Sequence, residues 1–180
     1  MAIAIGLLAA TPACAQGGAS DMPAEADMPA DLAQQTPEQI IAQAERIHPA
    51  GLYVLASKLM AAGRADEAVV WFYIGQLRYR FLLLTEPPDV ADERILFSAL
   101  SESVGRPINE YAFGDIPAAI GQIDEALAWD AAHPNALTPK EDHPAQLAET
   151  REGLRALRDQ MLTRQDEIRR TREQNGLENR

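Results

Sequence analysis

The chain has 180 residues, of which 47% are hydrophobic, so it can form one domain with a substantial core and is not disordered throughout. Its formal net charge is −11 at pH 7, and the residues before Glu149 carry eight basic and twenty acidic side chains. Because so acidic a body repels phosphate backbones, a nucleic-acid partner is disfavoured.

The first fifteen residues have the pattern of a secretory signal peptide. An apolar run to Ala10 is followed by Pro12 and by the small-x-small segment Ala13-Cys14-Ala15, and the run is too short to span a bilayer. We expect cleavage near Ala15 and a periplasmic or secreted protein, although no Lys or Arg precedes the apolar run. A lipoprotein acylated at Cys14 is less well supported, because the usual Leu is missing three positions earlier. Cleavage would remove Cys14, and the mature chain would then have neither a disulfide nor a thiolate nucleophile.

The next segment, residues 16–35, is rich in Ala, Gly, Pro and Asp and has few residues that could be buried, so we expect a disordered linker. The helical domain is expected to span residues 36–174 and to be followed by a disordered tail at 175–180. Its first helix should begin behind Thr36, because the sequence Thr-Pro-Glu-Gln provides a cap, a first-turn proline and the glutamine of a capping box.

Apolar periodicity predicts five further helices. They are expected at residues 49–61, 65–84, 90–104 and 116–130, and as a long final helix from Pro144. Gly63 and Gly105 should end the first and third of these, and the segment from Arg106 to Gly114 should be irregular. No segment alternates apolar and polar residues over a strand's length, so the predicted fold is all-α, a compact bundle of about six helices with a long C-terminal helix.

The predicted helix at 65–84 is apolar nearly all round and should therefore be buried on several sides. Trp71, Phe72 and Tyr73 are consecutive, so they point about 100° apart and must fill three different contacts. Two interpretations remain for the polar side chains Gln76, Arg78 and Arg80.

In the first interpretation, the arginines tie down the irregular segment through Asn109, Glu110 or Asp115. In the second, Tyr73, Gln76, Arg80 and Tyr111 line a binding groove. The candidate binding residues are Tyr73, Gln76, Arg78, Arg80, Asn109 and Tyr111.

Two stretches resemble helical repeats. Segment 114–134 matches the second helix of a tetratricopeptide (TPR) repeat at Gly114, Asp115, Ala119, Ile123, Ala126, Leu127 and Pro134. Segment 49–79 is similar to the related Sel1-type repeat, which it matches at Gly63, Asp66, Ala68, Trp71 and Phe72. The resemblance implies antiparallel hairpins whose grooves bind peptides or proteins. The copies are 51 residues apart rather than the 34 of a regular array, so we do not expect an extended solenoid.

No residue pattern indicates catalysis, and we assign no catalytic residue, metal ligand or cofactor. His48, His133 and His143 each precede a proline and lack metal-binding spacing, so we expect capping or exposed roles. Glu110 and Asp115 are the least ordinary acids because they flank an irregular segment, but helix capping is a sufficient role for them.

These observations favour an exported, non-catalytic protein-interaction module, an adaptor or a neutraliser, whose acidic surface suits a basic protein or peptide. A second hypothesis is a small helical enzyme that acts on an envelope substrate through Glu110 or Asp115 with Arg78 or Arg80. A third is an oligomerising module that associates through the final helix. That helix has a narrow apolar stripe formed by Leu147, Leu154, Leu157, Met161 and Ile168. The sequence predicts no membrane span and does not determine the oligomeric state.

Overall fold

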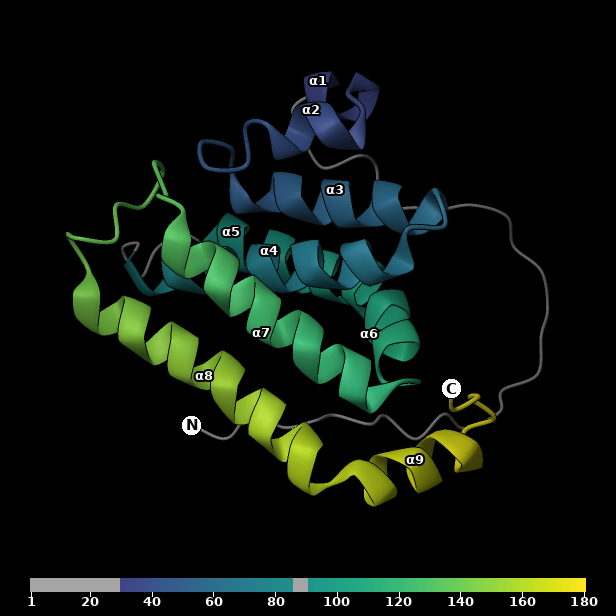
Figure 1. Cartoon of the computed structure of the whole chain (residues 1–180). Helices are drawn as coiled ribbons and strands as arrows, with labels where there is room; N and C mark the ends of the chain where they lie inside the picture. Colours follow the sequence, from purple (N-terminus) through teal and green to yellow (C-terminus); the bar gives the residue numbers. More distant parts are fainter. Residues whose placement is uncertain (1–29, 86–90) are drawn as a thin grey trace.

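The computed structural model describes residues 30–85 and 91–180, and within these ranges every regular element is a helix (Figure 1). The elements are α1 (Ala30–Gln34), α2 (Pro37–Ile41), α3 (Pro49–Ala61), α4 (Ala65–Thr85), α5 (Ala91–Leu100), the π-helical segment η1 (Ser101–Gly105), α6 (Arg106–Ala112), α7 (Ile116–Ala132), α8 (Pro144–Thr163) and α9 (Gln165–Gln174). The predicted all-α class and compact packing are confirmed. None of the described helices is both long and apolar enough to cross a membrane.

Helices α3 and α4 form the antiparallel pair at the centre of the molecule, and their contact is the most extensive between any two elements. The reversal uses Gly63 at φ 75°, a conformation that favours glycine. Along the pair, Ala56 and Ala68 are fully buried. A Cβ atom at Gly75 would lie 3.1 Å from Leu52 Cβ, so glycine also lets α4 approach α3 closely. Residues 49–61 and 65–79 therefore form a closely packed antiparallel pair.

The other helices surround this pair on several sides (Figure 1). α1 and α2 pack on α3, α7 packs on α4, and α8 lies across both α7 and α4. The continuous run of α5, η1 and α6 packs against α3 and α4. Burial on so many sides explains why α4 is apolar nearly all round.

Three helix starts follow the local rules that predicted them. Thr36 accepts a hydrogen bond from Gln39 N, and the Gln39 side chain accepts one from Thr36 N, which completes the capping box of α2. His48 caps α3, where Pro49 takes the first helical position. Asp115 caps α7 by accepting from Ala118 N at 3.1 Å.

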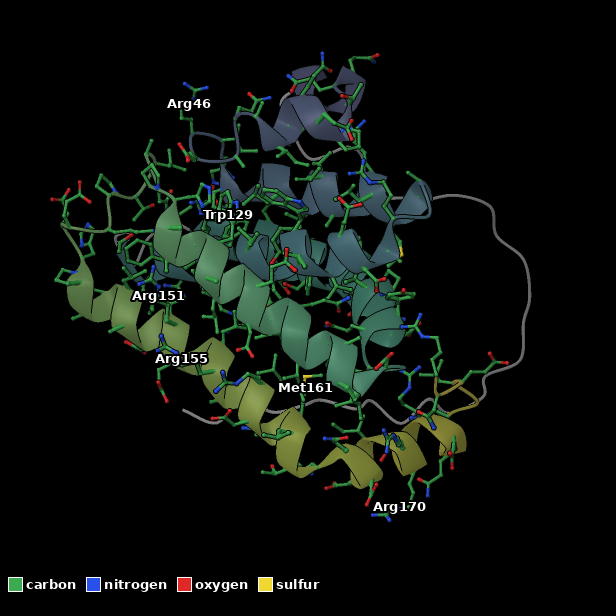
Figure 2. All side chains as sticks on the ribbon, viewed as in Figure 1. Arg46, Trp129, Arg151, Arg155, Met161 and Arg170 are labelled. Carbon is green, nitrogen blue, oxygen red and sulfur yellow. The ribbon has the colours of Figure 1, made fainter. Side chains whose placement is uncertain are left out.

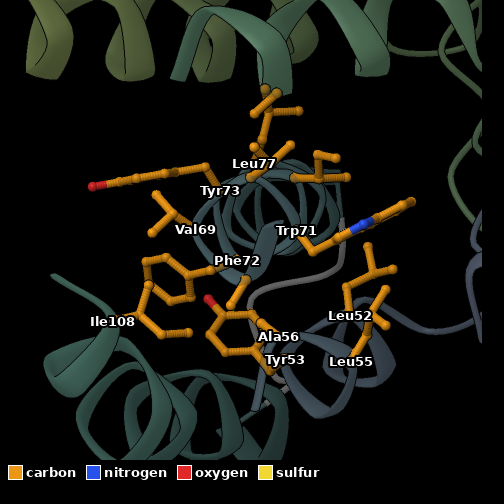
Figure 3. Packing of buried hydrophobic residues seen from close by; sticks show 14 of the residues in the cluster. Leu52, Tyr53, Leu55, Ala56, Val69, Trp71, Phe72, Tyr73, Leu77 and Ile108 are labelled. Atoms are coloured by element: carbon orange, nitrogen blue, oxygen red, sulfur yellow. The ribbon is translucent and has the colours of Figure 1, made fainter. Parts of the chain in front are cut away.

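Trp71, Phe72 and Tyr73 leave α4 in three directions, as predicted (Figure 3). The Trp71 ring packs edge-on against Trp129 of α7 at 5.1 Å, and the Phe72 ring packs against Tyr53 of α3 at 5.4 Å. The Tyr73 hydroxyl donates to Asn109 of α6. Three consecutive aromatic residues thus attach α4 to three different helices.

Two predictions for residues 90–114 are wrong. The helix does not stop at Gly105, and residues 106–112 are not irregular, because α5 continues through η1 into α6. A Cβ atom at Gly105 would meet the Phe72 ring at 2.9 Å, so this glycine serves close packing rather than helix termination. The wider π turn just before Pro107 allows the chain to remain helical at a residue that lacks an N–H group.

The termini also differ from expectation. Residues 30–34, in the predicted linker, form α1, and Leu32 is buried against α3. The predicted long final helix is divided into α8 and α9 at Arg164, whose φ and ψ of −116° and 23° are not helical. The predicted tail at 175–180 returns to the turn between α6 and α7. The predicted signal peptide, residues 1–15, and residues 16–29 lie outside the described ranges.

Candidate functional site

The six candidate binding residues do not line one groove. Tyr73 is buried and its hydroxyl donates to Asn109 Oδ1 at 3.0 Å. Gln76 and Arg80 are half-buried, and the Arg80 guanidinium lies 5.5 Å from the centre of the Phe97 ring of α5. The interpretation that the arginines tie down residues 106–115 is therefore wrong for Arg80. Residues 106–115 are instead attached to α4 by the hydrogen bond from Tyr73 to Asn109.

Arg78 lies in the interior, only 1% exposed, and turns away from the segment that we expected it to hold. It donates to the carbonyl oxygens of Ala44 at 2.9 Å and Pro134 at 2.7 Å. Its guanidinium also lies 4.7 Å from the centre of the Trp129 ring, which is a cation–π distance. Arg78 thus joins the turn before α3 to the end of α7.

The acid that compensates Arg78 is Asp130, a fully buried residue in the last turn of α7. Asp130 Oδ1 lies 3.5 Å from Arg78 Nε and 3.4 Å from Lys140 Nζ, and Oδ2 accepts from Arg151 at 2.7 Å. Figure 2 shows Trp129 near this end of α7 and Arg151 on the facing part of α8. We call Arg78, Asp130, Lys140 and Arg151 the Asp130 cluster.

Three cations surround one carboxylate, so the cluster has excess positive charge. Backbone carbonyl oxygens at the end of α7 offset part of this charge. Lys140 donates to the carbonyl oxygens of Asp130 and His133, and Arg78 to that of Pro134. The carbonyls at a helix C-terminus carry partial negative charge and lack partners within the helix, so cations are stabilised there. Burial lowers the pKa of Arg78 and of Lys140, and Asp130 opposes both shifts.

Sequence reasoning missed Asp130, Lys140 and Arg151. The sequence did contain one indication of them. Burying an arginine on an apolar helix is costly, so a buried acid elsewhere in the chain must compensate it. The contacts of the Asp130 cluster join α4, α7, α8 and the loop after α7, so the cluster stabilises the fold around the end of α7.

A second polar group joins the starts of α3 and α5 to α4. The Tyr79 hydroxyl, which is buried, donates to Glu93 Oε2 at 2.5 Å, and His48 Nε2 lies 3.5 Å from the same oxygen. His48 Nδ1 accepts from Ala50 N, which fixes the neutral tautomer with its proton on Nε2. Burial raises the pKa of Tyr79, and its hydrogen bond to Glu93 acts in the same direction.

Acidification should destabilise the fold through His48. Burial lowers the pKa of His48 below its ordinary 6.5, and Glu93 opposes this shift. A protonated Nδ1 could not accept from Ala50 N, so the geometry also favours the neutral ring. Because the unfolded chain takes up this proton at a higher pH than the folded chain, stability present above pH 6.5 is lost as pH falls toward the folded pKa.

The variant His48→Asn tests this prediction, because asparagine caps a helix well and does not titrate. Urea unfolding at pH 7.5 and pH 5.0 should show a smaller acid-induced loss of stability in the variant than in the wild type. His143→Asn is the matched control, since His143 lies at the start of α8 without a side-chain capping bond. Equal acid losses in the wild type and His48→Asn would contradict the assignment.

The third polar group lies at the opposite end of α4 and contains Tyr111. The Tyr111 hydroxyl and Gln122 Nε2 both donate to Asp66 Oδ1 at 3.0 Å, which connects α4, α6 and α7. The Arg180 guanidinium lies 3.7 Å from the centre of the Tyr111 ring and donates to Tyr111 O at 2.8 Å. Unlike the Asp130 cluster, this group is open to solvent, because Asp66 and Arg180 are exposed.

The four residues of the enzyme hypothesis do not meet. Arg78 is held by the Asp130 cluster, Arg80 lies against Phe97, and the Asp115 side chain caps α7. Glu110 is exposed on α6. Among residues 30–85 and 91–180, no group of three or more His, Cys, Asp or Glu side chains is placed to hold a metal ion.

Comparisons with known proteins add one relative. An uncharacterized protein of Haemophilus influenzae is 30% identical over 124 residues, which are 68% of this chain and 48% of that protein. The chain therefore spans about half the length of this relative. No protein-family model and no solved structure matches the chain.

Proposed function

We propose that the protein is an exported, non-catalytic interaction module that binds a basic segment of a partner protein. The observation that carries this proposal is the distribution of charge. In the described residues before Glu149, fifteen acidic side chains face eight basic ones, a net charge of −7. Two of those eight cations, Arg78 and Lys140, are engaged with Asp130 and the end of α7. When Asp130, their buried partner, is also left out, fourteen acidic and six basic side chains remain, a net charge of −8. The surface left to a partner is therefore acidic, and it complements a basic protein.

The architecture supports a TPR-like interaction module. The α3–α4 hairpin packs through the small residues Ala56 and Ala68, and α7 packs on α4 with Ala119, Ile123 and Ala126 buried. Ala68, Ala119, Ile123 and Ala126 are among the residues on which the repeat resemblance rests. The pattern of small residues between close helices is the one that repeat hairpins use to present grooves. Export remains part of the proposal on the strength of the sequence of residues 1–15.

The two alternative functions have less support. An enzyme would need its acids and arginines to converge, and Glu110, Asp115, Arg78 and Arg80 engage different partners on different elements. An oligomer formed through the final helix would need its apolar stripe to be free. Leu147, Leu154 and Met161 are instead buried, and Leu157 and Ile168 pack against the core of the same chain.

Affinity capture tests the proposal. The protein is used as bait on an envelope extract of the producing organism, and bound proteins are identified by mass spectrometry after washes at low and high salt. We expect a basic protein that is retained at low salt and released at high salt, because exposed charge pairs are screened. A bait with Glu125→Gln, Glu141→Gln and Asp142→Asn, all exposed acids, should retain less of it. Capture that neither salt nor the amide variant alters, or no capture at low salt, would refute the proposal.

A further inference from the structure

The last turn of α6 and the turn after it present three carbonyl oxygens to two arginines from the end of the described chain. Arg172 donates to Glu110 O at 2.8 Å, and Arg180 donates to Tyr111 O at 2.8 Å and, from its backbone N, to Gly114 O at 2.6 Å. The face of the Tyr111 ring completes the site. We call Glu110, Tyr111 and Gly114 the guanidinium cradle.

Gly114 gives the cradle its shape. A Cβ atom at this buried position would lie 3.2 Å from an Arg172 guanidinium nitrogen and 3.2 Å from Arg180 Nε. A side chain at residue 114 would therefore press on both guanidinium groups, and glycine leaves them room at the turn. Asp66 fixes the Tyr111 ring through its hydroxyl and adds negative potential beside it. An aromatic face beside directed carbonyl acceptors suits the planar, multiply donating guanidinium better than a lysine ammonium.

The two arginines are not held equally. Arg172 is 7% exposed and donates on both sides, to Glu110 O and to Glu178 O. Arg180 is exposed. Within the described residues, its guanidinium donates to Tyr111 O and lies over the Tyr111 ring. Burial lowers the pKa of Arg172, and the charge of Arg180 adds to this effect. The two cations therefore repel each other, and the exposed one is the easier to displace.

We propose that the guanidinium cradle is a docking site for an arginine of a basic partner and that Arg180 occupies it until the partner arrives. This inference rests on the proposed function and names the contact through which a basic segment is recognised. The segment from Leu177 to Arg180 then acts as an internal competitor. It keeps the cradle filled and sets the affinity that a partner must exceed.

Amide chemical shifts of the full chain measure occupancy of the cradle. The probe is N-acetylarginine amide, and the reporters are the backbone amides of Tyr111 and Gly114. In Arg180→Gln the internal competitor is gone, so the shifts should saturate at a probe concentration at least about tenfold lower than in the wild type. N-acetyllysine amide should shift these signals far less in the same variant. Arg170→Gln, which changes an exposed arginine on α9, is the matched control and should respond as the wild type does.

Adding Gly114→Ala to Arg180→Gln tests the geometry, because the new Cβ would lie 3.1 Å from Tyr111 O, the oxygen that accepts from the bound guanidinium. The shifts should then saturate only at a higher concentration of N-acetylarginine amide, while the rest of the spectrum shows a folded protein. The inference is overturned if Arg180→Gln shows no saturable shift, or if arginine and lysine probes act equally. If either of these results is obtained and a basic protein is still captured in a salt-sensitive way, only the assignment of the guanidinium cradle is wrong and the proposed function stands. A saturable arginine response without any captured protein would overturn the proposed function instead.

Discussion

Replacing Asp130 with Asn should lower the free energy of unfolding by about 3–5 kcal/mol, the usual cost of removing one partner from a buried ion cluster. Asp130 is fully buried and compensates Arg78, Lys140 and Arg151. The amide keeps the shape of the side chain but removes its charge. Three cations would then share the end of α7 without the carboxylate that pairs with them, and Arg78 could not reach water because it is 1% exposed.

Urea denaturation followed by circular dichroism measures the effect of Asp130→Asn. The matched control is Asp124→Asn, which breaks an exposed ion pair with Arg158 and should cost about 0–1 kcal/mol. Adding Arg78→Met to Asp130→Asn removes the most deeply buried of the three cations and should restore part of the lost stability. If Asp130→Asn and Asp124→Asn destabilise the protein equally, the cluster does not hold the fold together.

The parts of the fold that the sequence predicts correctly depend on local rules. Thr36 with Gln39, Pro49 and Asp115 mark helix starts because the groups that satisfy the first turn are only a few residues away. The divergence of Trp71, Phe72 and Tyr73 follows from helix geometry alone. Gly63 ends a helix because the reversal needs a positive φ. Each of these predictions requires no knowledge of which segments meet.

The parts that the sequence does not predict depend on segments distant in the chain. Gly105 has the same local signal as Gly63, but its role is set by the Phe72 ring, which is 33 positions earlier. The partners of Arg78 come from the turn before α3, from α7 and from the following loop. A sequence shows that a buried arginine needs an acid, but it does not show which acid. The same limit applies to Arg180, which the sequence predicts in a disordered tail but which lies on the Tyr111 ring.

Phe72 is the residue at which three helical segments converge, and its truncation tests that architecture. The side chain has no exposed surface, and its ring packs edge-on against Tyr53 at 5.4 Å (Figure 3). It also lies against Gly105 of η1. Phe72→Ala should therefore cost about 3–5 kcal/mol, because it removes a buried ring and leaves a cavity between α3, α4 and η1. Leu162→Ala, at a side chain that is 56% exposed, is the matched control and should change stability by no more than about 0.5 kcal/mol.

The contact of Phe72 with Gly105 makes a sharper prediction than the truncation alone. Gly105→Ala should destabilise the wild type by about 1–3 kcal/mol, because the new Cβ would lie 2.9 Å from the Phe72 ring. In the background Phe72→Leu, which shortens that side chain, Gly105→Ala should cost less or even stabilise, since alanine is the better helix former. Urea unfolding of the four proteins gives this coupling as a double-mutant cycle. Additive effects would mean that η1 does not pack on Phe72, and the continuous helix from α5 to α6 would lose the contact that positions it.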